Sequence, residues 1–577
     1  MHSSHNGLRK GRQMAFLRRD NRTGAPMSTK TAVITAMSSA ILLSSHAMAT
    51  SDQELHAVLQ QRFAGDRTGA CVAAAVIERS TVATAYFCAD PRTARPYDNR
   101  TAFEIGSVTK TMTATVLADL IVRGELSLDD PLTKILPPGT RVASFGGDPI
   151  LLKHIVTHTS GLPALPPRMT ITDQSNPYAR VTEQELMDSL ASVQLQSRPG
   201  TKFSYSNFAM MVLSYALAKR SGKPFEALLR EKLLDPLQMK NTFIQALPPA
   251  VRVIQGHMSN TKATPGWDFG AQTGGVGGIR ATLPDMIAYL KAQLSPDNTP
   301  LGKAITLTHQ SLFKSAQQQV GMNWIMAPIA GRMTFQHDGG TGGYSSLVIA
   351  DPQAGRGVIL LSDTALTDLG GLGTVGLHLV DSGHPLAKPR LAMAAPSDLL
   401  DALVGRYLLN GTLGMELRRK GSTLTIQADA QPEFEMGFDS AGDFYPLAFD
   451  ALLRPLRKAD GTYAFTWHQL GGTMKAERIS PAPQTVSNFQ PSPEELKAYE
   501  GTYPLAPTFA LKIFATGPKL FVQGTGQGPI EISPVAKDVF VAASVGAEIT
   551  FERDTSMKVI ALTLKQGGQN LRGIRQP

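Results

Sequence analysis

The sequence predicts an α+β region followed by two all-β units. Between residues 52 and 385, stretches with the apolar spacing of helices alternate with short runs of β-branched and aromatic residues. After residue 398 the helical spacing nearly disappears, and short β-type runs alternate with turns rich in Gly, Asp and Asn. A Pro- and Ala-rich stretch at 386–397 separates the two regions and is predicted to be a linker.

The all-β region contains an internal repeat. Gly405-Arg406-Tyr407 recurs 96 residues later as Gly501-Thr502-Tyr503, and the run 421–427 recurs at the same distance as 517–523. Each copy has room for about eight short strands, the number that a small closed barrel needs. The two units are predicted at 398–480 and 494–577, joined by a segment rich in Pro, Ser and Gln.

The first 49 residues have the layout of a secretory signal peptide. Seven Lys or Arg residues and one Asp accompany an apolar run of 12 residues, Ala32–Leu43, which the small-residue pattern Ala47-Met48-Ala49 follows. We therefore expect cleavage after Ala49 and a periplasmic or secreted mature protein, with Met1 or Met27 as the start. The alternative is a basic tail on a cytosolic protein. No other run reaches the roughly 18–20 apolar residues of a membrane span, so no transmembrane anchor is expected.

Composition and charge exclude several classes of protein. At 577 residues, with 42% hydrophobic and 18% charged residues, the chain is globular and too long for one core. The formal charge is +9, but the leader holds +6 of it, so no basic surface for a nucleic-acid partner is expected on the remainder. The sequence lacks His-Glu-x-x-His, a phosphate-binding glycine loop and a dinucleotide fingerprint, so we expect no cofactor.

The two cysteines, Cys71 and Cys88, bracket two β-type runs at 72–77 and 82–87. With a turn near Arg79-Ser80 they would face each other across a hairpin, within reach of a disulfide. An oxidising compartment favours that bond, and two buried thiols are the alternative. Two cysteines without paired histidines do not make a metal site, so none is expected.

A helix that begins at Ser107 carries the clearest chemical signal. Met112 and Val116 have helical spacing, Gly124 marks a plausible stop, and Lys110 lies one turn after Ser107 on the same face. A serine hydroxyl is a weak nucleophile until a neighbouring group takes its proton. A lysine ammonium lowers the pKa of a base beside it, and a helix N-terminus favours developing negative charge.

Ser-x-x-Lys alone is a weak signal, since it also occurs at Ser259-Lys262 and Ser311-Lys314. The order of the motifs along the chain distinguishes the copy at Ser107-Lys110 from the other two. Only Ser107 is followed by Tyr205-Ser206-Asn207 and then by His337-Asp338-Gly339, each in fitting local sequence. The last motif enters a glycine-rich strand, where a substrate can approach the backbone closely.

With these motifs, residues from about 60 to 385 resemble the class C β-lactamase and DD-peptidase superfamily of penicillin-recognising serine hydrolases. The resemblance implies a β-lactamase/transpeptidase-like catalytic domain at 52–385, with an antiparallel sheet and helices. The C-terminal repeats resemble the lipocalin-like domains of certain serine hydrolases, including D-aminopeptidases. Further similarity covers 123–131, 157–163, 277–282 and, toward D-alanyl-D-alanine carboxypeptidase/endopeptidases, 136–142.

The resemblance implies a catalytic role for three residues. Ser107 would be the acylated nucleophile. Tyr205, its pKa lowered by Lys110, would act as general base toward Ser107 and as acid toward the leaving group.

The same resemblance implies four further contacts with substrate. Asn207 would hold the acyl amide and help fix Lys110. The backbone N–H groups of Ser107 and Gly340 would form the oxyanion hole. His337 would line the site opposite Ser107, and Gly339 would give clearance.

Asp338 departs from the family pattern. Relatives that recognise penicillins and peptides commonly have threonine there, which hydrogen-bonds the carboxylate of the substrate. An aspartate would repel a carboxylate unless it turned away. This weakens the β-lactam and C-terminal-peptide interpretations, and it leaves room for esters or for peptides recognised from their amino end.

Three other residues have structural explanations. His158 is predicted to fix a loop rather than to take part in catalysis. Trp267 and Trp324 are predicted to pack in the interior, although Trp267 lies in a Gly-rich loop that could border the cleft.

We therefore expect an exported serine hydrolase that cleaves an amide in a β-lactam or a D-amino-acid peptide through an acyl-enzyme on Ser107. The second interpretation is a carboxylesterase that uses the same catalytic residues. A non-hydrolytic binding protein is the third, either a sensor that stays acylated or a ligand carrier built on the barrels. The expected partner is a small-molecule or peptide substrate, and the oligomeric state is open.

Overall fold

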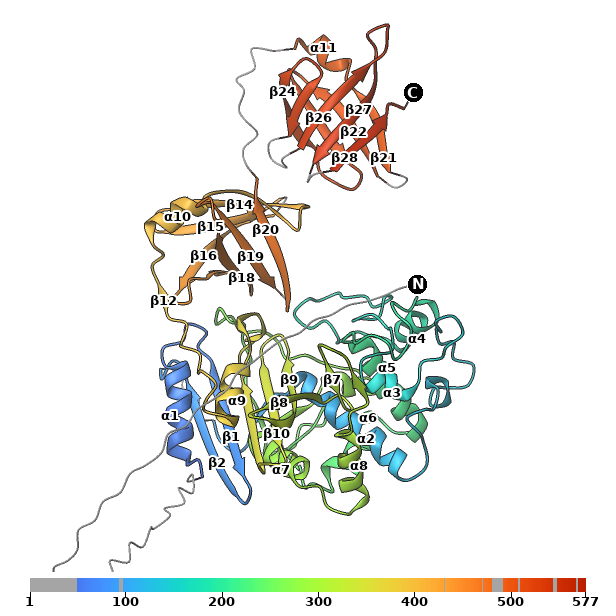
Figure 1. The fold of residues 1–577 in the computed structure, drawn as a ribbon, viewed down its shortest axis with the longest axis vertical. Helices are drawn as coiled ribbons and strands as arrows, with labels where there is room; N and C mark the ends of the chain where they lie inside the picture. The colour runs from blue at the N-terminus through green and yellow to red at the C-terminus, as the bar shows by residue number, and fades with distance from the viewer. Residues whose placement is uncertain are drawn as a thin grey trace, which may run out of the picture. The chain divides into compact units, whose positions relative to one another are not determined.

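An eight-stranded antiparallel sheet forms the centre of the N-terminal region (Figure 1). Its strand order, β2-β1-β11-β10-β9-β8-β7-β6, places the first hairpin of the chain against strands that come almost 300 residues later. β1 and β11 pair along their length, and nearly all of their residues are buried, which explains their continuous apolar sequences. The strands are β1 (Cys71–Glu78), β2 (Thr81–Cys88), β6 (Phe313–Lys314), β7 (Gln319–Val320), β8 (Ile325–Ile329), β9 (Arg332–Gly340), β10 (Ser345–Asp351) and β11 (Arg356–Ser362).

The computed structural model describes residues 49–92, 97–429, 431–469, 471–479, 491–506, 509–542, 547–566 and 569–576. The predicted leader up to residue 48 lies outside the described residues, as does most of the predicted connection between the two β units.

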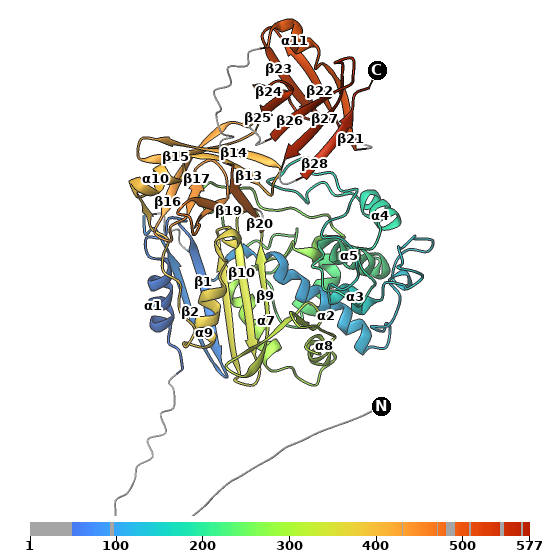
Figure 2. The ribbon, with the colours of Figure 1, turned by 45° about the horizontal axis from the view of Figure 1, so that its top comes forward.

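Helices cover both faces of this sheet. α1 and α9 pack on one face through Leu59 and Val375, whereas α2, α5 and α7 form a larger core on the other. In Figures 1 and 2, α1 lies beside β2, and α2 and α5 lie toward the opposite end of the sheet. The helices are α1 (Asp52–Phe63), α2 (Thr109–Val122), α3 (Leu152–Val156), α4 (Glu183–Ser192), α5 (Asn207–Ser221), α6 (Phe225–Leu229), α7 (Leu283–Leu294), α8 (Pro300–Thr308) and α9 (Gly373–Val380).

A small second sheet leads the chain into the predicted nucleophile turn. β3 (Thr101–Glu104) lies between β4 (Arg252–Val253) and β5 (Arg280–Thr282). Glu104, at the end of β3, is buried, and its carboxylate accepts from the guanidinium of Arg280 at 2.8 Å and from the N–H of Trp267 at 3.0 Å. These contacts fix the backbone two residues before Gly106.

The first hairpin carries a disulfide. Cys71 and Cys88 are directly opposite in the β1–β2 register, and their sulfur atoms are bonded. The turn between the strands contains Arg79 at φ 53°, close to the predicted position.

The C-terminal region consists of two eight-stranded closed sheets, as the repeat predicts. β13 pairs with β20 and β16 with β17 in the first, and the N–H of Gln576 donates to the carbonyl of Thr502 across the seam of the second. The first adds the short strand β12. Its elements are β12 (Ala392–Met393), α10 (Ser397–Leu403), β13 (Gly405–Leu409), β14 (Leu413–Lys420), β15 (Thr423–Ala428), β16 (Glu433–Asp439), β17 (Phe444–Pro446), β18 (Leu452–Arg457), β19 (Tyr463–Gln469) and β20 (Gly472–Arg478). Those of the second are α11 (Pro493–Lys497), β21 (Gly501–Ala506), β22 (Phe509–Thr516), β23 (Lys519–Gly524), β24 (Ile530–Ala536), β25 (Val539–Ala542), β26 (Ala547–Arg553), β27 (Val559–Gln566) and β28 (Gln569–Ile574).

The two barrels repeat one local device. The hydroxyl of buried Tyr407 donates to the carbonyl of Leu403 at 2.8 Å, and Tyr503 makes the same bond to Tyr499 at 2.8 Å. Each bond ties the first strand of a barrel to the segment four residues before it, which is why the Gly-x-Tyr motif marks the start of both units.

A buried ion-pair cluster links β16 to the segments around residues 67 and 390. Asp439 accepts from Arg67 at 2.8 Å and from Arg390 at 3.1 Å, and Asp443 accepts from Arg390 at 2.8 Å. The side chains of Arg67 and Asp439 are 2% and 0% exposed. We call these four residues the Asp439 cluster.

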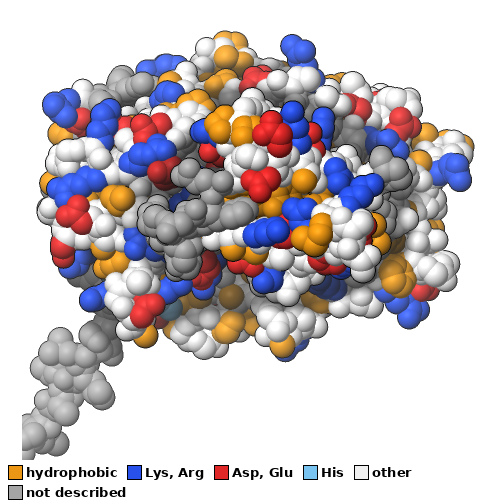
Figure 3. Space-filling view, turned by 90° about the horizontal axis from the view of Figure 1, so that it is seen from above, with side chains coloured by type: hydrophobic (Ala, Val, Ile, Leu, Met, Phe, Trp, Pro, Cys, Tyr) orange, Lys and Arg blue, Asp and Glu red, His pale blue; other side chains and the backbone are white. Residues whose placement is uncertain are grey.

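The surface carries charges of both signs. On the face shown in Figure 3, Lys and Arg side chains are interspersed with Asp and Glu. Within the described part of the chain, no helix is both long enough and apolar enough to cross a bilayer.

Asp439→Ala should destabilise the protein strongly, because it leaves the buried guanidinium of Arg67 without its ion-pair partner and leaves Arg390 with Asp443 alone. The expected loss is about 3–5 kcal/mol of unfolding free energy, measured by chemical denaturation. Asp401→Ala is the control, since its ion pair with Arg419 is largely exposed and should contribute less than about 1 kcal/mol. Equal losses in the two variants would contradict a special role for the cluster.

Candidate active site

The predicted nucleophile lies in a short turn between β3 and α2. Ser107 occupies a 3₁₀ segment, η1 (Gly106–Val108), and α2 begins two residues later, at Thr109. The Nζ atom of Lys110 lies 2.8 Å from the Oγ atom of Ser107. The two side chains therefore meet as their spacing predicts.

Burial makes Lys110 an unusual lysine. Its side chain is 1% exposed, and its Nζ also donates to the carbonyl of Val276 at 2.7 Å. Burial lowers the pKa of Lys110 to about 7, and the charge of Asp338 opposes this shift. A large fraction of the lysine is thus a neutral amine at neutral pH, able to accept a proton from the adjacent hydroxyl.

Tyr205 lies on the other side of Ser107, immediately before the N-cap of α5. Its hydroxyl lies close enough to Ser107 for that residue to act on its pKa, and the Nζ atom of Lys110 lies 5.1 Å from its ring centroid. The direction of its pKa differs from the prediction. Burial raises the pKa of Tyr205 above its ordinary value, and Lys110 does not lower it. The phenol therefore stays protonated and is a proton donor at rest.

His158 holds Tyr205 in place. The centroids of the two rings lie 4.3 Å apart. The N–H of Ser206 donates to the Nδ1 atom of His158 at 3.2 Å, and the N–H of Ser204 donates to the backbone carbonyl of His158 at 2.8 Å. Burial lowers the pKa of His158 well below its ordinary value, so its ring is neutral. These contacts agree with a loop-fixing role.

Asn207 begins α5 and makes a different contact from the predicted one. Its Nδ2 donates to the hydroxyl of Tyr178 at 3.0 Å, whereas Lys110 is held by the carbonyl of Val276. The Oδ1 atom of Asn207 is buried and accepts no hydrogen bond within the described structure. This oxygen therefore retains unused hydrogen-bonding capacity next to Tyr205.

Glycines let β9 approach the nucleophile turn. A Cβ atom on Gly106, whose φ is +47°, would lie 2.7 Å from the nitrogen of Gly340, and one on Gly339 would lie 2.1 Å from the carbonyl oxygen of Ile105. Real side chains cannot occupy these positions without moving the backbone. The contact places the backbone of Gly340 against that of Gly106, the residue before Ser107.

The ladder geometry orients the N–H of Gly340. Thr341 donates to the carbonyl of Tyr344 at 3.1 Å, so the next pair, Gly340 and Ser345, belongs to the non-hydrogen-bonded kind. The N–H of Gly340 thus points away from β10, toward the other edge of β9. β8 no longer covers that edge, because its pairing with β9 ends at Ile325 opposite Gln336. Together with the N–H of Ser107, the N–H of Gly340 can form the predicted oxyanion hole.

His337 is buried at the same strand edge. Its Nδ1 lies 2.6 Å from the carbonyl oxygen of Asp338, an acceptor, so Nδ1 carries the proton and Nε2 is left as an acceptor. Its ring lies 6.4 Å from that of Tyr205, which places it across the cleft as predicted. Burial lowers the pKa of His337.

Two features of the site had no clear signal in the sequence. The carbonyl of Val276 belongs to the turn η4 (Gly274–Val276), and a backbone acceptor leaves no mark in its own side chain. Tyr178 stacks on Phe269 and contacts Trp267 at an angle of 57°, and the three rings form an aromatic wall beside Asn207. Trp324 is fully buried, as predicted for a packing residue.

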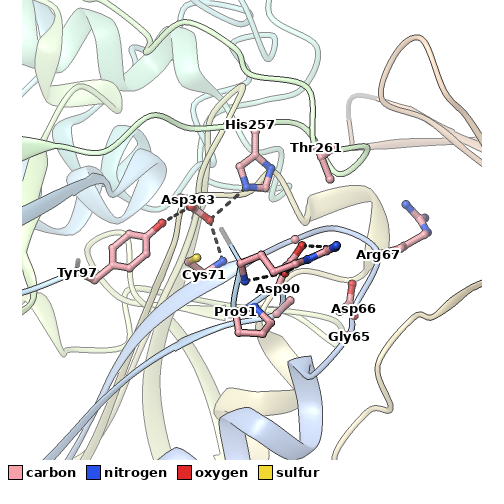
Figure 4. Close-up of a pocket in the computed structure, with 13 residues that line it drawn as sticks. Gly65, Asp66, Arg67, Cys71, Asp90, Pro91, Tyr97, His257, Thr261 and Asp363 are labelled. Carbon is pink, nitrogen blue, oxygen red and sulfur yellow. Dashed lines mark hydrogen bonds and ion pairs between the residues drawn. The ribbon is translucent and has the colours of Figure 1, made fainter. Parts of the chain in front are cut away.

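A second cavity, of about 720 Å³, lies beside the disulfide (Figure 4). Tyr97 and His257 flank Asp363, whose carboxylate accepts from the hydroxyl of Tyr97 at 2.7 Å and from the N–H of Cys71 at 2.9 Å. Cys71 of the predicted disulfide lines this cavity, but none of the predicted catalytic or substrate-binding residues does, so the cavity is separate from the Ser107 site.

The family model described as Beta-lactamase matches residues 55–372, and the chain belongs to this family. A domain of unknown function, DUF3471, matches residues 487–575, which include the second barrel. Family membership supports a serine hydrolase, and it agrees with the α+β fold and the resemblance predicted from the motifs.

Three curated relatives illustrate the range of the family. The D-alanyl-D-alanine-carboxypeptidase/endopeptidase AmpH of Escherichia coli (strain K12) is 31% identical over 44% of this chain and 69% of its own. A beta-lactamase of Pseudomonas fluorescens is 26% identical over 48% and 84%, and the esterase EstB of Burkholderia gladioli is 28% identical over 50% and 84%. A solved class C beta-lactamase mutant aligns with a TM-score of 0.46 at 20% identity, covering 54% of this chain and 92% of its own.

Gly106→Ala should strongly reduce the reactivity of Ser107, because the added methyl group forces Gly340 away from the turn that carries Ser107. We expect the rate of labelling by a fluorophosphonate to fall about 100-fold or more, since small displacements in active sites have effects of this size.

Gly124→Ala is the matched control. Gly124 also has a positive φ, +75°, but nothing lies within 4 Å of the added methyl group. It should lose about 1 kcal/mol of stability and keep its labelling rate. Similar labelling by both variants would refute the close-approach argument.

Proposed function

We propose that this protein is an exported serine hydrolase that forms an acyl-enzyme on Ser107 and cleaves an amide in a β-lactam or a D-amino-acid-containing peptide. One observation carries the proposal. A buried lysine whose pKa is lowered to about 7 contacts the serine hydroxyl directly, beside the close approach of the backbones of Gly106 and Gly340. This arrangement supplies a nucleophile, a base and an oxyanion site together.

Acylation would proceed as follows. The Oγ atom of Ser107 attacks the carbonyl carbon, and its proton passes to the neutral amine of Lys110. The carbonyl oxygen becomes an oxyanion between the N–H groups of Ser107 and Gly340. When the bond to the leaving group breaks, Tyr205 donates its hydroxyl proton to the leaving nitrogen, and the Lys110 ammonium restores that proton to Tyr205.

Deacylation would use the same groups in reverse. A water molecule attacks the acyl carbon and gives one proton to the Lys110 amine. The ester bond to Ser107 then breaks, and the Oγ atom recovers a proton from Lys110. The net change is the addition of one water molecule across the scissile bond. A protein that lacked this second half would be the acylated sensor considered above.

Carboxylesterase activity is the second candidate. Asp338 occupies the position where carboxylate-binding relatives commonly have threonine. The relative EstB of Burkholderia gladioli, of whose length 84% aligns with this chain, is named an esterase. Ester cleavage needs the same nucleophile and oxyanion hole, with an alcohol as the leaving group.

Ser107→Ala should eliminate labelling by a fluorescent penicillin and by a fluorophosphonate, because no other serine hydroxyl of the described residues accepts a hydrogen bond from a buried lysine. Circular dichroism should show an unchanged fold. Ser311→Ala is the control, since Ser311 begins another Ser-x-x-Lys match but is exposed, and it should label normally. Undiminished labelling of Ser107→Ala would overturn the assignment.

The acylation rate should rise with pH through about 7. The base must be neutral, and the neutral fraction of Lys110 grows tenfold per pH unit below its pKa and levels off above it. Single-turnover rates with an uncharged ester would show this profile. Lys110→Arg, whose guanidinium stays charged, should be at least about 100-fold slower throughout. A flat profile between pH 5.5 and 8.5 would contradict Lys110 as the base.

A further inference from the structure

Asp338 introduces an uncompensated negative charge at the cleft. It lies on β9 between His337 and Gly339, and its side chain is exposed. No cationic side chain of the described residues lies within ion-pair distance of its carboxylate, whereas Asp351 on the neighbouring strand pairs with Arg332. Its charge is thus free to act on a bound molecule.

The charge of Asp338 reaches the reacting groups. It acts on Lys110 from α2, on Tyr205 at the entry to α5 and on His337 of its own strand, and in each case it favours the more positive form. Burial lowers the pKa of both His337 and Lys110 and so favours their neutral forms. Less positive charge therefore faces Asp338 than two ordinary basic side chains would supply.

The position of Asp338 along β9 indicates which end of a substrate it meets. The oxyanion lies at Gly340, two residues or about 7 Å further along the strand. Tyr205, the proton donor to the leaving group, faces His337 at the other end of this segment. A substrate with its carbonyl at Gly340 thus has its leaving group beside His337 and Asp338.

We propose that Asp338 is a specificity-determining residue that selects substrates whose leaving group is cationic and disfavours leaving groups that end in a carboxylate. This inference rests on the proposed function and narrows it. The bond changes are those of acyl transfer to Ser107, and the leaving amine or alcohol departs with the proton of Tyr205. A peptide that ends in a free carboxylate one residue beyond the scissile bond would be a poor substrate, and one with an ammonium group there would be a good one.

Three esters of N-acetyl-D-alanine test the proposal. The choline ester has a cationic leaving group, the 3,3-dimethylbutyl ester is its uncharged isostere, and the 2-carboxyethyl ester has an anionic one. Values of kcat/KM are measured for the wild type and for Asp338→Asn at low salt. The intrinsic reactivity of each ester cancels when the ratios are compared between the two proteins.

Asp338→Asn should lower the ratio of kcat/KM for the choline ester to kcat/KM for the dimethylbutyl ester at least tenfold. It should raise the corresponding ratio for the carboxyethyl ester. In the wild type, 1 M salt should reduce the preference for the cation, because it screens the charge. Glu125→Gln removes an equal charge at the far end of α2, about 21 Å from Ser107, and should change neither ratio.

Ratios that are the same in the wild type and Asp338→Asn would overturn the role of Asp338, while hydrolysis of the uncharged ester would still support the proposed function. If no ester is turned over, the same ratios are taken from rates of Ser107 acylation measured by mass spectrometry. In that case the absence of turnover contradicts the proposed hydrolase activity. The role of Asp338 is then decided by whether the acylation rates of the cationic, uncharged and anionic esters differ between the wild type and Asp338→Asn. The absence of any acylation would overturn both.

Discussion

The backbone contact between the nucleophile turn and β9 is the constraint on which the site depends. Gly106 and Gly340 touch without side chains between them, and Gly339 fits under the carbonyl of Ile105. Both partners are fixed from behind: Glu104 anchors β3 through Arg280, and the hydroxyl of Ser346 on β10 donates to the same Ile105 carbonyl at 2.8 Å. Two strands that are far apart in the sequence are thereby brought close enough to share one anion.

Burial then determines the chemistry of the groups around this contact. Burial lowers the pKa of Lys110 and raises that of Tyr205, so it favours the uncharged form of both groups. The direct contact of Lys110 with Ser107 is the reason that we propose the amine as the base and the phenol as the proton donor. Because burial reduces the positive charge on Lys110, the exposed carboxylate of Asp338 has a larger influence on the potential at the site.

Much of this could be predicted from the sequence, because it rests on local patterns. The two barrels follow from a repeat with Gly-x-Tyr at its start, and the meeting of Ser107 with Lys110 follows from one helical turn. The pKa direction of Tyr205 was wrong, since enclosure by distant segments cannot be read from neighbouring residues. The carbonyl of Val276 and the bond between Asn207 and Tyr178 were missed because tertiary contacts of this kind leave no periodic signal.

The order of strands in the catalytic sheet governs how the chain can acquire its structure during synthesis. Ala74 of β1 pairs with Leu360 of β11, so the first hairpin must wait, with an unpaired edge, until nearly 290 further residues have been made. In the second barrel, neighbouring strands follow one another in the sequence, and the seam joins Thr502 to Gln576, only 74 residues apart. The slowest stage of folding is therefore expected in the domain that carries Ser107.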